Sequence, residues 1–157
     1  MQWADVLKDP HLRNLPYKIE LNEWGQIVMS PASNRHRYYQ GEIIWQMRQK
    51  LGHGHVFPEC SIETPKGTKV ADVVWCSETF IRKHGYETPY TEVPEICIEI
   101  VSPSNNPAEM EEKRKLYFSK GAQEVWIIAE GGDVALYDAQ GRIPESRFGV
   151  GLNLSGI

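Results

Sequence analysis

Two acidic residues interrupt apolar segments of the sequence that have the composition of β-strands. Asp72 lies within Val-Ala-Asp-Val-Val-Trp, and Glu99 lies within Ile-Cys-Ile-Glu-Ile-Val. A carboxylate inside an apolar strand is unfavourable unless a partner compensates its charge. Two such acids on strands that could be neighbours indicate a shared cation, and Mg²⁺ prefers hard oxygen ligands. Each acid could instead pair with a buried arginine or lysine, or face solvent from a half-exposed strand.

Lys113 is a third candidate, on a helix predicted for residues 107–120. The apolar side chains of this helix form one broad arc, made by Met110, Leu116, Tyr117 and Phe118. Lys113 falls inside that arc, whereas Lys115 falls on the opposite side, because successive residues of a helix are about 100° apart. An ammonium group that points at a sheet needs a carboxylate or a phosphate as partner. A simple salt bridge to Glu109, one turn earlier, is the alternative.

The elements that must position these residues follow from apolar periodicity and from turn and cap residues. Strands are expected at residues 17–22, 26–29, 55–63, 70–75, 95–101, 124–129 and 134–137. Helices are expected at residues 2–8, 34–51 and 107–120, with one helical turn near Phe80 and Ile81. The order of strands and helices implies an α/β fold, in which helices flank a central mixed sheet. The length of 157 residues suits a single domain over residues 1–157.

Composition and cysteine usage narrow the class of protein. Hydrophobic residues make up 41% and charged residues 24%, which indicates a globular chain with no membrane span. No signal peptide is visible, and the three cysteines form no CxxC pair, so we expect free thiols and a cytoplasmic location. Four of the tryptophans are expected in the core, namely Trp24, Trp45, Trp75 and Trp126.

The net charge of −4 bears on the choice of partner. Nucleic-acid binding favours a basic surface, which argues against this class of partner. A metal centre would account for part of the discrepancy, because it concentrates carboxylates whose charge the bound ion reverses. Basic residues also form short clusters at positions 35–37, 48–50, 82–84 and 113–115. These clusters could bind phosphate, or they could equally be solvated surface.

The ordered set Asp72, Glu99 and Lys113 resembles the PD-(D/E)XK nuclease superfamily. In the usual pattern of that superfamily a lysine follows the second acid by two residues, and this position is Val101 here. One branch, the Uma2-like family of restriction-endonuclease-like proteins (also called DUF820), carries its lysine on the following helix. The segments that carry the resemblance extend over nearly the whole chain: Tyr17–Leu21, Val28–Pro31, Arg35–His36, Ala71–Trp75, Pro94–Ser104, Glu112–Tyr117, Gly121 and Glu124–Trp126.

The resemblance implies a metal centre of defined composition. Asp72 and Glu99 would hold Mg²⁺, with Mn²⁺ as a substitute and the carbonyl of Ile100 as a candidate third ligand. Lys113 would orient or activate the attacking water and offset the charge that develops on the phosphate.

Two further residues match positions of this family. Glu20 would be an outer ligand or the partner that positions Lys113, unless it is an exposed strand acid. His36 would contact phosphate or assist proton transfer, unless it makes only a local hydrogen bond at a helix start. Acids clustered without a metal should repel one another, so at least one of them should have a raised pKa.

The activity that the resemblance implies is endonucleolytic hydrolysis of DNA by a metal-activated water, which leaves a 5′-phosphate and a 3′-hydroxyl. Double-stranded DNA and a homodimer are expected, because two copies related by a two-fold axis can cut both strands. The alternative is an inactive nuclease-fold module that binds nucleic acid or a protein partner. The net charge and the lack of a DNA-reading domain favour that alternative. A metal-dependent hydrolase of another phosphoester is the third hypothesis.

Overall fold

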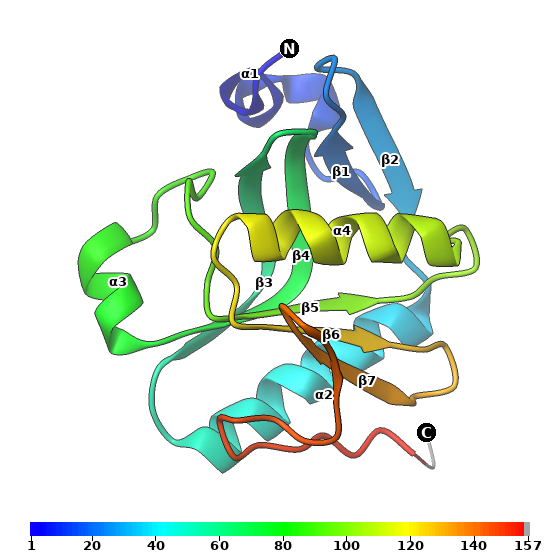
Figure 1. Ribbon diagram of the computed structural model, residues 1–157. Helices are drawn as coiled ribbons and strands as arrows, with labels where there is room; N and C mark the ends of the chain where they lie inside the picture. Colours follow the sequence, from blue (N-terminus) through cyan, green and yellow to red (C-terminus); the bar gives the residue numbers. More distant parts are fainter. Residues whose placement is uncertain (156–157) are drawn as a thin grey trace.

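The strongly apolar segments form one six-stranded sheet in the computed structural model, which describes residues 1–155 (Figure 1). The strands lie in sequence order: β3 (His55–Thr64), β4 (Gly67–Cys76), β5 (Ile96–Ile100), β6 (Glu124–Ile128), β7 (Val134–Asp138) and β8 (Gly141–Ile143). β5 and β6 are parallel, and the other neighbouring pairs are antiparallel. The parallel pair needs a crossover connection, and the helix after β5 supplies it.

Helices cover both faces of this sheet (Figure 1). The helical segments of residues 1–155 are α1 (Trp3–Lys8), η1 (Pro10–Leu12), α2 (Asn34–Leu51), α3 (Glu78–His84) and α4 (Pro107–Ser119). Tyr39 and Ile43 of α2 pack with Ile98 of β5, whereas Tyr117 of α4 packs with Cys97 of the same strand. Because neighbouring strand residues point to opposite faces, the two helices lie on opposite sides of the sheet. The fold class predicted from the sequence is confirmed.

A second, two-stranded sheet lies against β4. It pairs β1 (Tyr17–Leu21) with β2 (Ile27–Pro31) in antiparallel register. Val70 of β4 packs in the small core beneath this hairpin, and its N–H donates to the carboxylate of Glu20 at 2.7 Å. Glu20 of β1 therefore faces the central sheet, although β1 belongs to a separate hairpin.

The pairing of β3 with β4 is interrupted where Glu59 lies opposite Asp72, although the register is the same on either side. Glu59 has a φ of 57°, in the left-handed region that non-glycine residues seldom adopt. The side-chain amide of Gln40 on α2 donates to the backbone oxygen of Asp72 at 2.8 Å and to the Glu59 carboxylate at 2.9 Å. Gln40 thus supplies a hydrogen bond where the strand ladder lacks one.

Some sequence predictions were wrong. The single turn expected near Phe80 is the longer helix α3, and β8 was not predicted at all. Trp24 and Trp45 are 74% and 58% exposed rather than in the core. Trp24 lies in the turn between β1 and β2, and Trp45 lies about 200° around α2 from the buried Ile43.

Residues 156 and 157 of the predicted domain lie outside the described residues. Among the helices of residues 1–155, none combines the length and the apolar character that crossing a bilayer requires.

Candidate active site

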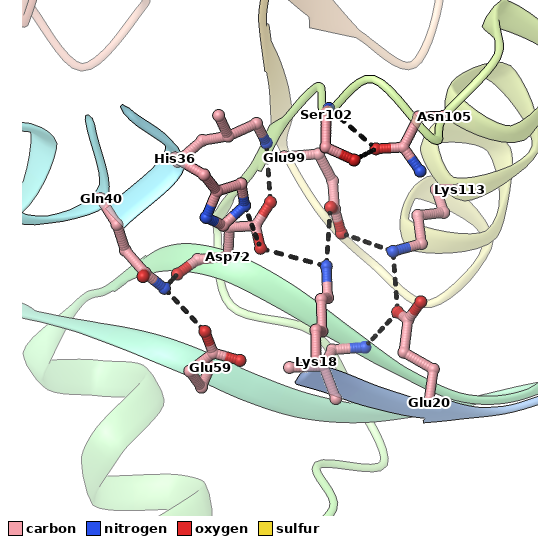
Figure 2. Close-up of polar contacts among 12 residues, drawn as sticks. Lys18, Glu20, His36, Gln40, Glu59, Asp72, Glu99, Ser102, Asn105 and Lys113 are labelled. Carbon is pink, nitrogen blue, oxygen red and sulfur yellow. Dashed lines mark hydrogen bonds and ion pairs between the residues drawn. The ribbon is translucent and has the colours of Figure 1, made fainter. Parts of the chain in front are cut away.

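The two interior acids lie on neighbouring strands, as their sequence context predicted. β4 and β5 are antiparallel, with Val73 opposite Ile98. Asp72 and Glu99 are the next residues along each strand, so they also lie opposite each other. Each acid is 1% exposed. Their carboxylates meet at the ammonium group of Lys18, whose Nζ lies 3.1 Å from Asp72 Oδ1 and 3.1 Å from Glu99 Oε2 (Figure 2).

Lys18 is the main site residue that sequence reasoning missed. It comes from β1 and points to the same side of the strand as Glu20, two residues later. Burial alone would lower the pKa of Lys18, but the charges of Asp72 and Glu99 outweigh burial and raise it well above its usual value. The sequence offered one indication of Lys18, namely that a lysine and an acid alternate in one strand. Many exposed strands have the same pattern.

Lys113 points at the sheet, as its place on the helix predicted. Its Nζ lies 2.7 Å from Glu20 Oε2 and 3.2 Å from Glu99 Oε1. The alternative partner, Glu109, instead accepts hydrogen bonds from two asparagines near the start of α4. Lys115 is exposed and pairs with Glu111 on the surface. The contrast between the two lysines predicted from the helical wheel is therefore confirmed.

Glu20 is a buried partner of Lys113 rather than an exposed strand acid. Its Oε2 also accepts the N–H of Val70. Burial raises the pKa of a carboxyl group, but here the attraction of Lys113 and Lys18 prevails and lowers the pKa of Glu20. Glu20 therefore holds the ammonium of Lys113 in place.

His36 lies at the start of α2, where Ser33 caps the helix by accepting its backbone N–H. Its side chain points into the site, with Nε2 3.2 Å from Asp72 Oδ1 (Figure 2). Asp72 Oδ2 accepts the backbone N–H of Ile100 at 2.7 Å. Despite burial, the pKa of Asp72 is far below its usual range, because Lys18 and His36 stabilise the ionised form.

Glu99 differs from the other two acids in its titration. Its Oε1 contacts Lys113 and also accepts a hydrogen bond from the Tyr117 hydroxyl at 2.6 Å. Burial raises the pKa of Glu99, and repulsion by Asp72 and Glu20 adds to it, against the attraction of the two lysines. The expectation that at least one clustered acid has a raised pKa is confirmed.

A pocket of about 260 Å³ opens onto this cluster. The residues of the ion-pair cluster, Lys18, Glu20, Asp72, Glu99 and Lys113, line it, and so do three further charged residues, Arg37, Glu59 and Glu109. His36, Ile100 and several polar residues complete its wall, among them Gln40, Ser102 and Asn105. Ser102 donates its hydroxyl to Asn105 Oδ1 at 2.9 Å, which fixes the loop after β5 at the edge of the pocket (Figure 2).

The donor set fits a cation held by two carboxylates. Among residues 1–155, no three His, Cys, Asp or Glu side chains converge in a way that would hold a metal ion by themselves. Mg²⁺, however, commonly binds through one or two carboxylates and keeps several waters. Asp72 and Glu99 already direct one oxygen each at a single cation, the ammonium of Lys18. The cluster brings three carboxyl groups together with two lysines, so its acidic groups outnumber its ammonium groups by one.

Comparison with known proteins gives a structure of the same fold and a family. A structure described as a "putative nuclease belonging to DUF820" from Anabaena variabilis ATCC 29413 has a TM-score of 0.76 to this chain, with 20% identity, and covers 99% of this chain and 94% of that one. It shows the same fold. No curated protein matches the chain. A family model named Uma2, described as "putative restriction endonuclease", matches residues 3–152. The chain therefore belongs to the Uma2 family.

Proposed function

We propose that the protein is a Mg²⁺-dependent endonuclease that hydrolyses phosphodiester bonds of DNA. One observation carries the proposal: two buried acids on adjacent strands meet at one cation position, beside an inward-pointing lysine, in an open pocket. The description of its family as restriction endonucleases supports the same reaction class. A phosphodiester is the substrate class that such a cation and lysine would polarise.

Asp72 and Glu99 would hold the metal, Mg²⁺ or Mn²⁺ in its place, with the Ile100 carbonyl as a third ligand. Such a metal would supply acidification of water and neutralisation of charge on the phosphate. The N–H of Ile100 fixes Asp72 Oδ2, so that Oδ1 faces the pocket, where Lys18 and His36 contact it. His36 would orient this oxygen or reach the phosphate.

Lys113 would orient the attacking water and offset the negative charge that develops on the phosphate. Glu20 positions its ammonium, and the N–H of Val70 in turn positions Glu20. This chain of contacts ties the lysine of α4 to the hairpin and to the central sheet. Lys113 therefore takes the place of the lysine that the usual motif would put at Val101.

The substrate would enter through the pocket that Arg37, Ser102 and Asn105 border. Their guanidinium, hydroxyl and amide groups suit the phosphate and sugar of a nucleic acid. Double-stranded DNA, cut by a homodimer with one site for each strand, is the substrate form that we propose.

Incubation of supercoiled plasmid with the protein tests the proposal directly. Nicked or linear DNA should form with Mg²⁺ or Mn²⁺, should not form with EDTA, and should not form with Asp72→Asn. The Lys115→Ala protein is the control, because this lysine is exposed and distant from the pocket. The same products in EDTA would contradict a metal-dependent reaction.

An inactive DNA-binding or protein-binding module is the second candidate. The observation that favours it is the ammonium of Lys18, which satisfies both acids without a metal. Retained binding to DNA in a mobility-shift assay, with no cleavage in any divalent cation, would favour this candidate over the endonuclease.

A further inference from the structure

We propose that Lys18 is an internal counter-ion that occupies the metal position between Asp72 and Glu99 and leaves it when a divalent cation binds. This inference rests on the proposed metal site and adds a residue that governs its affinity. The ammonium comes from the separate hairpin, not from the sheet that carries the acids. Its side chain is only 10% exposed, so the contact is not a loose surface pair.

The ammonium and a metal ion would compete for the same atoms. Lys18 Nζ contacts Asp72 Oδ1 and Glu99 Oε2, each at 3.1 Å. A Mg²⁺ ion held by Asp72 and Glu99 would need the two oxygens that now accept from the ammonium. Two positive charges cannot share these oxygens, because their repulsion in a buried site is strong.

Lys113 is arranged differently, although it also contacts Glu99. It contacts the other oxygen, Oε1, together with the Tyr117 hydroxyl, and its second partner is Glu20 rather than Asp72. The two oxygens of Glu99 are thus divided between the two lysines. Lys113 can keep its contacts while Oε2 binds a metal, but Lys18 cannot.

The displaced side chain has space and a partner nearby. Lys18 lines the pocket of the site and also an adjoining cavity of about 500 Å³. Glu59 lines both spaces as well. The long flexible stem of a lysine allows its ammonium to move between such positions. We infer that Glu59 receives the ammonium of Lys18 when it leaves the two acids.

The device has a thermodynamic consequence for the metal-free protein. Without a cation, the buried Asp72 and Glu99 would repel each other and carry an uncompensated desolvation cost. Lys18 removes this cost, but every metal ion that binds must first displace it. The metal affinity of the wild type is therefore lower than that of the same site without the lysine.

Lys18→Met tests this inference, because methionine keeps most of the stem and removes the charge. Isothermal titration with Mn²⁺ should give a dissociation constant about tenfold or more below that of the wild type, as for other buried charge competition. The metal-free variant should also melt below the wild type, and Mn²⁺ should raise its melting temperature more. Lys69→Met is the matched control, since Lys69 is a nearby half-buried lysine that hydrogen-bonds to the carbonyl of Leu21.

The outcomes separate this inference from the proposed function. Equal affinity in wild type and Lys18→Met overturns the inference and leaves the metal site intact. An equal gain in Lys69→Met also overturns it, because the effect would then be one of general charge. Absence of Mn²⁺ binding in both proteins overturns the proposed metal site together with the inference.

A measurement on the wild type covers the case in which Lys18→Met does not fold. Acetylation of lysines, read by peptide mass spectrometry, should modify Lys18 several-fold faster in saturating Mg²⁺ than in EDTA. Lys69 should react equally in both conditions. Unchanged labelling of Lys18 in a protein that binds Mg²⁺ would show that the ammonium stays in place, and the inference would be wrong.

Discussion

Glu124 and Glu99 are both strand glutamates with 1% exposure, yet they are compensated in different ways. Glu124 accepts hydrogen bonds from neutral N–H groups, the indole of Trp126 at 2.9 Å and the backbone of Arg147 at 2.8 Å. Glu99 instead meets two lysine ammonium groups and a hydroxyl at the wall of a pocket. The N–H donors of Glu124 are fixed in the fold and hold the end of its strand in place. A lysine ammonium, by contrast, can be replaced by another cation. The kind of compensation, not burial, therefore distinguishes a candidate site from a structural acid.

The largest expected effect separates the two glutamates by activity. Glu99→Gln should lower the rate of plasmid cleavage by roughly 10³-fold, as loss of a group that stabilises the reaction electrostatically does. Glu124→Gln should leave the rate of the folded protein nearly unchanged and lower the melting temperature, because an amide cannot accept both N–H donors equally well. Similar rate losses in the two variants would show that the kind of compensation does not separate a site acid from a structural one.

The next effect concerns the lysine that faces Glu99. Lys113→Ala should lower cleavage on the order of 10²-fold while metal binding is retained, and Lys115→Ala should change little. Lys113→Arg should restore little activity, since a planar guanidinium does not replace a compact ammonium. Rates for the three variants, measured beside their Mn²⁺ affinities, check this. Equal loss of cleavage in Lys113→Ala and Lys115→Ala would show that the lysine facing the pocket has no special role in cleavage.

Much of this site followed from the sequence because its acids break a local pattern. Asp72 and Glu99 are anomalous in apolar strands, and the wheel of one helix suffices to orient Lys113. Lys18 lacks such a signal, because its short strand, Tyr-Lys-Ile-Glu-Leu, alternates polar and apolar residues as exposed strands do, and its partners lie 54 and 81 residues away. The fold was predictable to the same extent: strongly periodic helices and apolar strands were found, whereas the short strand β8 has no periodicity long enough to detect.

A smaller effect is expected on stability. Millimolar Mg²⁺ should raise the melting temperature of the wild type, because it binds the folded site and not the open chain; at 100 times the dissociation constant this is about 2.7 kcal/mol. The Asp72→Ala and Glu99→Ala double variant should show no shift, and Glu124→Gln should shift as the wild type does. Differential scanning fluorimetry with and without EDTA measures it. An equal shift in the double variant would place the ion elsewhere.

The smallest effect distinguishes the two site acids by pH. The folded-state pKa of Asp72 is lowered, so its ionisation contributes stability above its unfolded pKa of about 4, and this stability is lost as pH falls through the folded value. The folded-state pKa of Glu99 is raised, so stability falls as pH rises from its unfolded pKa of about 4 to the folded value, and the loss is complete above it. Without metal at pH 7, Asp72→Asn should therefore destabilise, and Glu99→Gln should be neutral or stabilising. Urea unfolding at pH 7 and pH 4 measures this, and the reverse order at pH 7 would contradict it.

The left-handed backbone at Glu59 has a consequence for engineering and for natural variation. A glycine would adopt this conformation more easily by about 1 kcal/mol, so relief of backbone strain favours Glu59→Gly. That substitution removes the carboxylate that holds one hydrogen of the Gln40 amide, whose other hydrogen bonds to the backbone of Asp72. Relief of the strain alone would thus loosen the strand that carries a candidate metal ligand. At this one position, backbone conformation favours one residue and alignment of the site favours another.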